Sequence, residues 1–266
     1  MSGQRPEADA PRDHGRPSTP NGLGTSAPDP ARVAELSTAL NGLLTRIDTA
    51  VAAAGRPAGS VRLLPVTKFF PAADVDILYH LGRREFGESR EQEASAKVDA
   101  LAYDDAEWHM IGRLQRNKAR AVARWAHTVH SVDSERLANA LDRAAQDALA
   151  AGERAEPLRV LLQVSLDDDP GRGGVAPADL PALADLVAKA PGLHLAGLMA
   201  IPPLDANTHA SFAKLATLHT SLLVQHADAT ELSAGMSGDL EKAVEHGSTC
   251  VRVGTALMGA RPITSA

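Results

Sequence analysis

Residues 61 to 74 read VRLLPVTKFFPAAD, and this stretch separates two kinds of α/β fold. Leu63, Leu64 and Val66 form a short apolar run of the kind found in buried strands. Lys68 stands just past the end of that run, although lysine is rarely buried unless it is paired or has a function. The turn that follows holds no glycine, whereas the first turn of a dinucleotide-binding doubly wound sheet is rich in glycine. The stretch therefore argues against such a sheet.

The same strand-then-helix unit recurs along the rest of the chain. Short apolar runs occupy residues 61–67, 84–89, 107–112, 128–133, 158–166, 194–201, 230–236 and 249–257. Helical patterns lie between them, at residues 72–82, 90–103, 116–126, 134–152, 176–192, 209–227 and 238–247. Parallel strands need such crossovers, and eight units in about 230 residues match a (β/α)8 barrel of the TIM type. An open doubly wound sheet would alternate too, but the glycine-free first turn favours a single barrel.

Two segments precede the first strand. Apolar residues at helical spacing, beginning with Val33, Leu36 and Leu40, predict an extra N-terminal helix over about 31–54. Residues 1–30 are rich in Pro, Gly, Asp and Arg and poor in large apolar residues, which is typical of a disordered tail. We therefore expect one folded domain over residues 31–266.

Composition excludes several classes of protein. The chain has 266 residues, of which 44% are hydrophobic and 23% charged, and its formal net charge is −6. Without a long basic run we expect no nucleic-acid partner, and without an apolar run of about 20 residues we expect no membrane span. Cys250 is the single cysteine, so no internal disulfide forms and the expected compartment is the reducing cytoplasm. The paired histidine spacing of zinc hydrolases is missing, so no metal site is predicted.

Polar residues follow the predicted strands at the end where barrel enzymes carry their active sites. They are Thr67, Lys68, Glu88, Ser89, His109, Ser131, Asp133, Gln163, Ser233, Ser237, Arg252 and Thr255. Met236 and Gly254 are not polar but stand in the same loops. Polar groups buried without partners cost free energy, so their convergence indicates a ligand site.

The last two strand ends suggest an anion site. Ser237 can cap the helix that follows the seventh strand, Gly254 lets the backbone approach a ligand closely, and Thr255 offers a hydroxyl. Barrels commonly bind phosphate with the loops after strands seven and eight. Taken singly, each residue has an ordinary structural explanation, and Arg252 could equally form a structural ion pair.

Several motifs in order resemble those of the pyridoxal phosphate homeostasis proteins. They are PVTKFFP, FGESREQE, WHMIGRLQRNK, VHSVDS, LLQVSLDDDPGRGG, GLMAIPP, LSAGMSGDLEKAV and VRVGTALMGAR, and together they run from about residue 61 to residue 261. The resemblance implies the barrel of alanine racemase, the fold-type III class of pyridoxal 5'-phosphate (PLP) proteins.

The resemblance also implies a role for each rim residue. Lys68 carries PLP as a Schiff base, Arg252 faces the pyridine nitrogen, and Ser237, Gly254 and Thr255 bind the phosphate. Ser89 stands where the family has an asparagine near the cofactor ring. His109 and Met236 complete the predicted cofactor-binding set. The implied function is vitamin B6 and amino-acid/keto-acid homeostasis, without known catalytic turnover.

An amino-acid racemase is the alternative. Racemisation needs an acid–base group on each face of the substrate, and Lys68 could serve one face. Tyr79 and Tyr103 fall on helices outside the barrel, which leaves His109 as the one substitute, unless it is a hydrogen-bonded structural histidine. An arginine facing the pyridine nitrogen also makes the ring a weaker electron sink. A Schiff-base aldolase acting on a sugar phosphate is a third possibility.

The partners follow from these readings. We expect PLP, amino-acid adducts of PLP, and PLP-dependent apo-enzymes that would receive it. The chain ends at Ala266, soon after the eighth strand, without the second domain that completes the alanine racemase dimer, so we expect a monomer.

Overall fold

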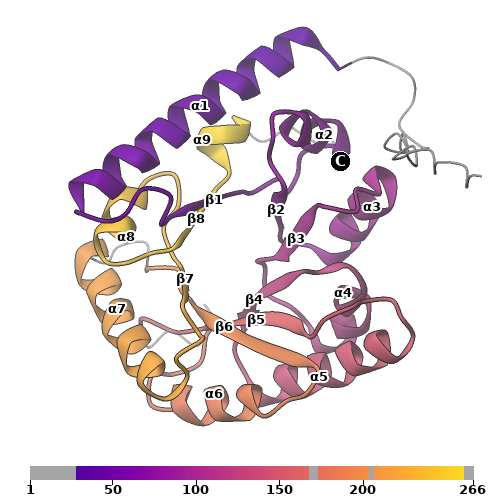
Figure 1. Cartoon of the computed structure of the whole chain (residues 1–266), viewed down its shortest axis with the longest axis vertical. Helices are drawn as coiled ribbons and strands as arrows, with labels where there is room; N and C mark the ends of the chain where they lie inside the picture. The colour runs from indigo at the N-terminus through magenta and orange to yellow at the C-terminus, as the bar shows by residue number, and fades with distance from the viewer. Residues whose placement is uncertain (1–27, 168–172, 204–206, 261–266) are drawn as a thin grey trace, which may run out of the picture.

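The computed structural model describes residues 28–167, 173–203 and 207–260. Within them, parallel strands alternate with helices and curl into a nearly closed barrel with the helices outside (Figure 1). The predicted (β/α)8 barrel with an N-terminal helix is confirmed. The tail predicted for residues 1–30 lies outside the described residues, apart from its last three positions.

The eight strands match the eight apolar runs. They are β1 (Arg62–Pro65), β2 (Glu85–Glu88), β3 (Glu107–Met110), β4 (Thr128–Val132), β5 (Leu158–Gln163), β6 (Leu193–Met199), β7 (Glu231–Ser233) and β8 (Cys250–Val253). The helices are α1 (Pro30–Ala53), α2 (Ala72–His80), α3 (Glu91–Leu101), the short 3-10 helix η1 (Arg116–Lys118), α4 (Ala119–Trp125), α5 (Glu135–Ala150), α6 (Leu180–Ala188), α7 (Thr208–Gln225), α8 (Leu240–Glu245) and α9 (Thr255–Met258).

The sheet order is β1-β8-β7-β6-β5-β4-β3-β2, so β1 and β2 meet where the barrel closes. There Val66 pairs with Gly87, and the Thr67 N–H donates to the Gly87 carbonyl at 3.0 Å. The contact lies at the C-terminal ends of both strands, directly before Lys68. Closure of the barrel therefore fixes the backbone next to this lysine.

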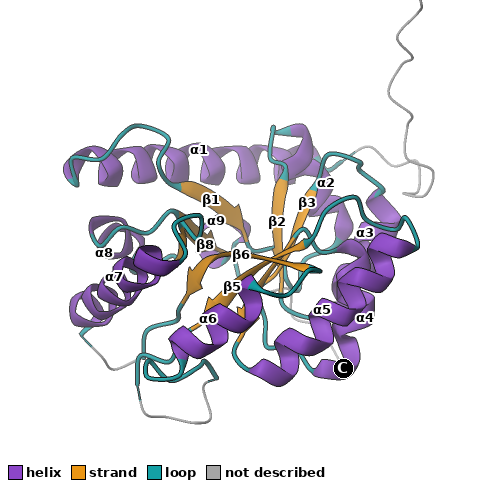
Figure 2. Ribbon diagram, turned by 60° about the horizontal axis from the view of Figure 1, so that its bottom comes forward, coloured by secondary structure: helices purple, strands orange, loops and turns teal. Residues whose placement is uncertain are grey.

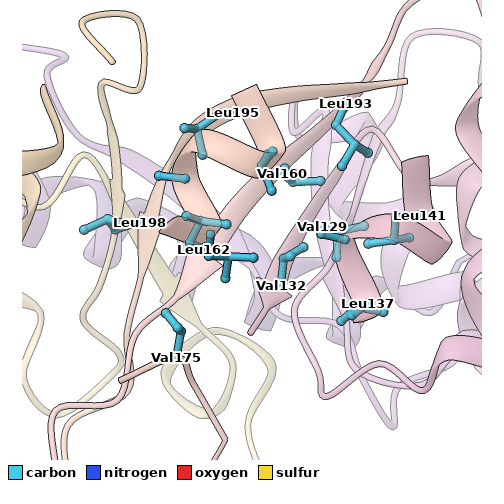
Figure 3. Packing of buried hydrophobic residues seen from close by; sticks show 14 of the residues in the cluster. Val129, Val132, Leu137, Leu141, Val160, Leu162, Val175, Leu193, Leu195 and Leu198 are labelled. Atoms are coloured by element: carbon cyan, nitrogen blue, oxygen red, sulfur yellow. The ribbon is translucent and has the colours of Figure 1, made fainter. Parts of the chain in front are cut away.

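The main core lies between the strands and the surrounding helices. Val129, Val160 and Leu162 of β4 and β5 belong to one buried cluster with Leu137 and Leu141 of α5 (Figure 3). All five side chains are buried. Each contributes roughly 1.5–3 kcal/mol on burial. The apolar residues at helical spacing and the β-branched residues of the strands, both visible in the sequence, are the ones that form this core layer.

Helix α1 covers one side of the barrel, next to α8 and α9 (Figures 1 and 2). The Asp29 carboxylate caps it by accepting from the Ala31 N–H at 3.0 Å, and Pro30 occupies its first turn. Its apolar stripe, including Leu36 and Leu40, is buried in the second core cluster. Among the described residues, no helix is both long enough and apolar enough to cross a membrane.

The eighth apolar run does not remain a strand. The sequence predicts extended structure over 249–257, but β8 ends at Val253 and the short helix α9 begins at Thr255. Gly254 makes the turn between them with φ −104° and ψ −80°. Leu257 and Met258 are apolar because α9 buries them against α1, not because they belong to the sheet.

Candidate functional site

A cavity of about 470 Å³ opens at the C-terminal ends of the strands. Most of the predicted site residues line it, namely Lys68, Ser89, Met236, Ser237, Arg252, Gly254 and Thr255. Asp133, Gln163 and Arg113 line it as well. The volume lies in the range of pockets that bind small molecules and cofactors. Residues from β1, β2, β7 and β8 thus come together as the strand count predicted.

The backbone around Lys68 is held in an unusual conformation. Phe69 has φ 70°, which is rare for a residue with a bulky side chain. Its N–H donates to the Glu93 carboxylate at 2.6 Å. The Lys68 ammonium lies 5.8 Å from the centre of the Phe69 ring, whose other neighbour is the Arg90 guanidinium at 5.1 Å. Phe69 therefore borders the lysine within the cavity.

A buried ionic cluster lies directly behind this loop. The Lys97 ammonium donates to the Thr67 carbonyl at 2.9 Å, to Glu88 at 2.7 Å and to Glu93 at 2.9 Å. The Thr67 hydroxyl donates to the same Glu88 oxygen at 2.6 Å. Glu88 is fully buried, and burial raises the pKa of its carboxyl group against the opposing effect of Lys97. The cluster holds the residues on both sides of Lys68.

Arg252 is a buried cation whose hydrogen bonds go to neutral acceptors. It is 4% exposed, and it donates to the Ser233 hydroxyl at 2.6 Å and to the Ala200 carbonyl at 2.9 Å. Burial lowers the pKa of its guanidinium, which nevertheless stays charged in proteins. Within the described part of the chain, no carboxylate forms an ion pair with it, although the more distant charge of Asp239 opposes the lowering of its pKa. A buried charge of this kind is costly unless a ligand compensates it.

The two loops of the predicted phosphate cradle lie against each other. The Ser237 hydroxyl accepts from the Ala256 N–H, in the first turn of α9, at 3.3 Å. The predicted capping role is wrong, because Asp239 occupies the N-cap position of α8. The nearest atoms to a Cβ added at Gly254 would belong to Val66, at 3.5 Å, so packing within the protein does not require a glycine there.

Ser89 takes its position from a close backbone contact. A Cβ at Gly112 would lie 2.2 Å from the Ser89 carbonyl oxygen, so only glycine lets the loop after β3 approach the loop after β2. The Gly112 carbonyl accepts from the Ser131 hydroxyl at 2.7 Å. Three successive strand ends are thereby connected beside the cavity.

Comparisons with known proteins agree with this architecture. Residues 43–262 match the model of the alanine racemase N-terminal domain. The pyridoxal phosphate homeostasis protein of Mycobacterium tuberculosis is 52% identical over 249 residues, which is 89% of this chain and 96% of that protein.

The chain belongs to the pyridoxal phosphate homeostasis protein family.

Solved structures extend the comparison. The structure of PipY from Synechococcus elongatus with PLP bound is 38% identical, with a TM-score of 0.73, and the match covers 84% of this chain and all of that one. Alanine racemase from Corynebacterium glutamicum is 15% identical, with a TM-score of 0.65, over 89% of this chain and 63% of that one. The second likeness concerns the fold alone.

His109 is the predicted site residue that lies elsewhere. It is 1% exposed and does not appear among the described residues that line the cavity. Its Nδ1 lies 2.9 Å from Nε2 of His130, whose Nδ1 lies 3.0 Å from the Ser233 hydroxyl. His109 thus belongs to a column of polar side chains inside the barrel that leads to Arg252.

The two tyrosines lie outside the barrel, as the helix assignments predicted. Their rings stack on each other with centroids 3.6 Å apart, and the Tyr79 hydroxyl contacts Asp105 at 2.5 Å. Neither lines the cavity within the described residues.

Sequence reasoning missed two contributors to the site. Lys97 gave no signal because its helix pattern is otherwise polar, although its i,i+4 spacing from Glu93 could have suggested a pair. Helix α1 supports both sides of the cavity. Its Arg46 donates to the Ser237 carbonyl at 2.9 Å, and its Arg32 stacks on the Phe70 ring at 5.6 Å.

Proposed function

We propose that this chain binds PLP in the cavity and holds it through a Schiff base on Lys68, as part of vitamin B6 and amino-acid/keto-acid homeostasis. The Lys68 amine condenses with the cofactor aldehyde and releases one water. The observation that carries the proposal is Arg252, a buried guanidinium that faces the same cavity as Lys68 and forms no ion pair with a carboxylate among the described residues. PipY, whose structure was solved with PLP bound, supports the choice of ligand.

The residues of the cavity fit the cofactor at both of its ends. Arg252 would face the pyridine nitrogen, which cannot take a proton from an arginine and so stays unprotonated. Ser237, Gly254 and Thr255 would contact the phosphate, where the missing side chain of Gly254 leaves the backbone accessible. Ser89 and Met236 would border the ring. When bound, PLP supplies an electrophilic carbon at Lys68.

The cavity supports holding the cofactor rather than racemisation. Among the described residues, no histidine or tyrosine lines it, so neither residue type is placed to act as the second acid–base group. Amino-acid adducts of PLP and PLP-dependent apo-enzymes are the partners we propose for loading and release. We also propose that the protein is a monomer and that it acts in the cytoplasm.

Borohydride reduction tests the attachment. Reduction of the PLP-loaded protein should leave a pyridoxyl group on the peptide that contains Lys68, without any added sugar, which also separates this function from that of an aldolase. Lys68→Ala should lose the yellow absorbance. Lys242→Ala is a matched control, because Lys242 is a surface lysine outside the cavity whose ammonium donates to the Thr208 hydroxyl at 2.9 Å.

A colourless wild-type protein after PLP addition, or a pyridoxyl group on another lysine, would overturn the proposal. Solvent deuterium exchange at the Cα of alanine and serine tests the racemase alternative, and exchange that depends on Lys68 would show turnover.

A further inference from the structure

The opposite end of the barrel carries a ring of charged residues. Arg62, Glu85, Glu107, Arg159 and Glu231 lie at or next to the N-terminal ends of their strands. Arg62 pairs with Glu85 at 3.0 Å and with Glu231 at 2.7 Å, and Arg159 also pairs with Glu231. Three carboxylates thus face two guanidinium groups, and the carboxylate without an arginine partner is that of Glu107.

Two histidines are the neighbours of this carboxylate. Its oxygen lies 3.3 Å from Nδ1 of His127 and 4.0 Å from Nε2 of His109. The two histidines are distant in sequence, but the backbone N–H of His127 donates to the Trp108 carbonyl at 2.8 Å, which places His127 next to β3. This explains why histidine spacing along the chain gave no sign of the cluster.

The His109 Nε2 atom is buried and has no hydrogen-bond partner among the described residues. The Glu85 and Glu107 carboxylates, at 3.9 and 4.0 Å, are too far away to accept from it. Buried polar atoms are nearly always satisfied, so an ion or a water is the partner expected for this atom, which lies near a histidine and a carboxylate.

We propose that Glu107, His109 and His127 form a binding site for Zn²⁺ or a similar divalent transition-metal ion. One possible ligand atom from each of the three residues lies within 4.8 Å of the others. Two imidazoles, one carboxylate and a water make a common four-coordinate zinc site. Bond lengths of about 2.0–2.2 Å require ligand atoms roughly 3.3–3.6 Å apart, so a small inward movement of the partly exposed Glu107 and His127 completes the site.

The surroundings of His109 suit a metal ligand. Ligating histidines normally donate their other ring N–H to a fixed acceptor. Coordination through Nε2 leaves the proton of His109 on Nδ1, which then donates to Nε2 of His130 at 2.9 Å. His130 in turn donates from Nδ1 to the Ser233 hydroxyl at 3.0 Å. The polar column inside the barrel thereby fixes the ring plane of His109.

Calorimetric titration of the full-length, PLP-loaded protein with ZnCl₂ tests the site. Glu107→Gln and His127→Ala should each weaken Zn²⁺ binding at least about tenfold, and a given concentration of Zn²⁺ should raise the Tm of the wild type more than that of either variant. Both positions are partly exposed, so folding is expected to survive. The PLP absorbance should stay unchanged, which shows that the ion is not bound by the cofactor.

A second cluster serves as the control. His209, Glu245 and His246 also lie close together, but they are on the surface and none has a buried unsatisfied atom. His246→Ala should leave the buried-site affinity unchanged. The proposal is overturned if the wild type binds no Zn²⁺, if both Glu107→Gln and His127→Ala bind as tightly as the wild type, or if His246→Ala alone removes binding.

Discussion

Replacing Lys97 with methionine tests the ionic cluster behind the proposed Schiff-base lysine. The Lys97 ammonium holds Glu88, Glu93 and the Thr67 carbonyl at 2.7–2.9 Å. Methionine fills a similar volume without the charge. Glu88, which is fully buried, then retains only the Thr67 hydroxyl as a partner. A buried carboxylate stranded in this way takes up a proton instead of remaining charged.

The cost follows from the protonation. Bringing Glu88 from its ordinary pKa of 4.5 to a protonated state at pH 7 costs about 2.5 × 1.36, or about 3.4 kcal/mol. This agrees with the roughly 3–5 kcal/mol found when one partner of a buried ion pair is removed. At pH 5.5 the same calculation gives about 1.4 kcal/mol.

The pH dependence has a defined sign. When the pKa of a carboxyl group is higher in the folded than in the unfolded state, the protein loses stability as pH rises above the pKa of the unfolded state. In the wild type Lys97 opposes that rise, so the stability difference between wild type and Lys97→Met should grow between pH 5.5 and pH 7.

Urea unfolding of both PLP-free proteins across this range measures the difference. The double variant Glu88→Gln, Lys97→Met should recover part of the lost stability and lose the pH dependence, because it buries no charge. A difference that is constant with pH, or below about 1 kcal/mol at pH 7, would refute the reasoning.

Three further predictions concern the cavity and the single thiol. Arg252→Met should weaken PLP binding about 10- to 100-fold in an equilibrium titration, since a hydrogen bond to a charged group contributes about 1.5–3 kcal/mol; unchanged affinity would remove Arg252 from the site. Gly254→Ala should change the free energy of unfolding by less than about 1 kcal/mol, because the nearest atoms to the new Cβ belong to Val66 at an ordinary distance. It should weaken PLP binding about tenfold, because the methyl group would hinder the close approach of the phosphate to the backbone; equal affinities would contradict that approach. Burial raises the pKa of Cys250 to about 11, so at pH 7 its thiol should react with a maleimide about 100-fold more slowly than an ordinary thiol of pKa about 9. The labelling rate should rise about tenfold per pH unit, and complete labelling should require unfolding. Rapid labelling at pH 7 would show that the thiol is accessible.

The fold could be predicted because it depends on short-range patterns. Apolar runs such as that around Leu64 and the helical stripe of α1 alternate with the periods that strands and helices impose. Several boundaries shifted by a few residues, and the largest change of structure lies after Val253, where one apolar run covers a strand and then a helix. Periodicity over so few residues cannot separate the two.

The site was predictable where it depends on strand ends and not where it depends on distant contacts. Lys68, Arg252 and Ser237 line one cavity because parallel strands bring their C-terminal ends to one rim. Lys97 was missed, and His109 was predicted at the site but does not line the cavity, because the surroundings of both residues come from packing between elements. His109 ends its strand in sequence, but its side chain points into the barrel toward His130.

The column inside the barrel explains how Arg252 can keep its charge for a ligand. Barrel interiors are usually filled by branched apolar side chains, but here His109, His130 and Ser233 occupy part of that space. Burial lowers the pKa of both histidines well below the ordinary value, so the column is neutral. It orients the guanidinium through the Ser233 hydroxyl without neutralising it. A carboxylate in the position of Ser233 would orient Arg252 equally well, but it would cancel the positive charge that faces the cavity.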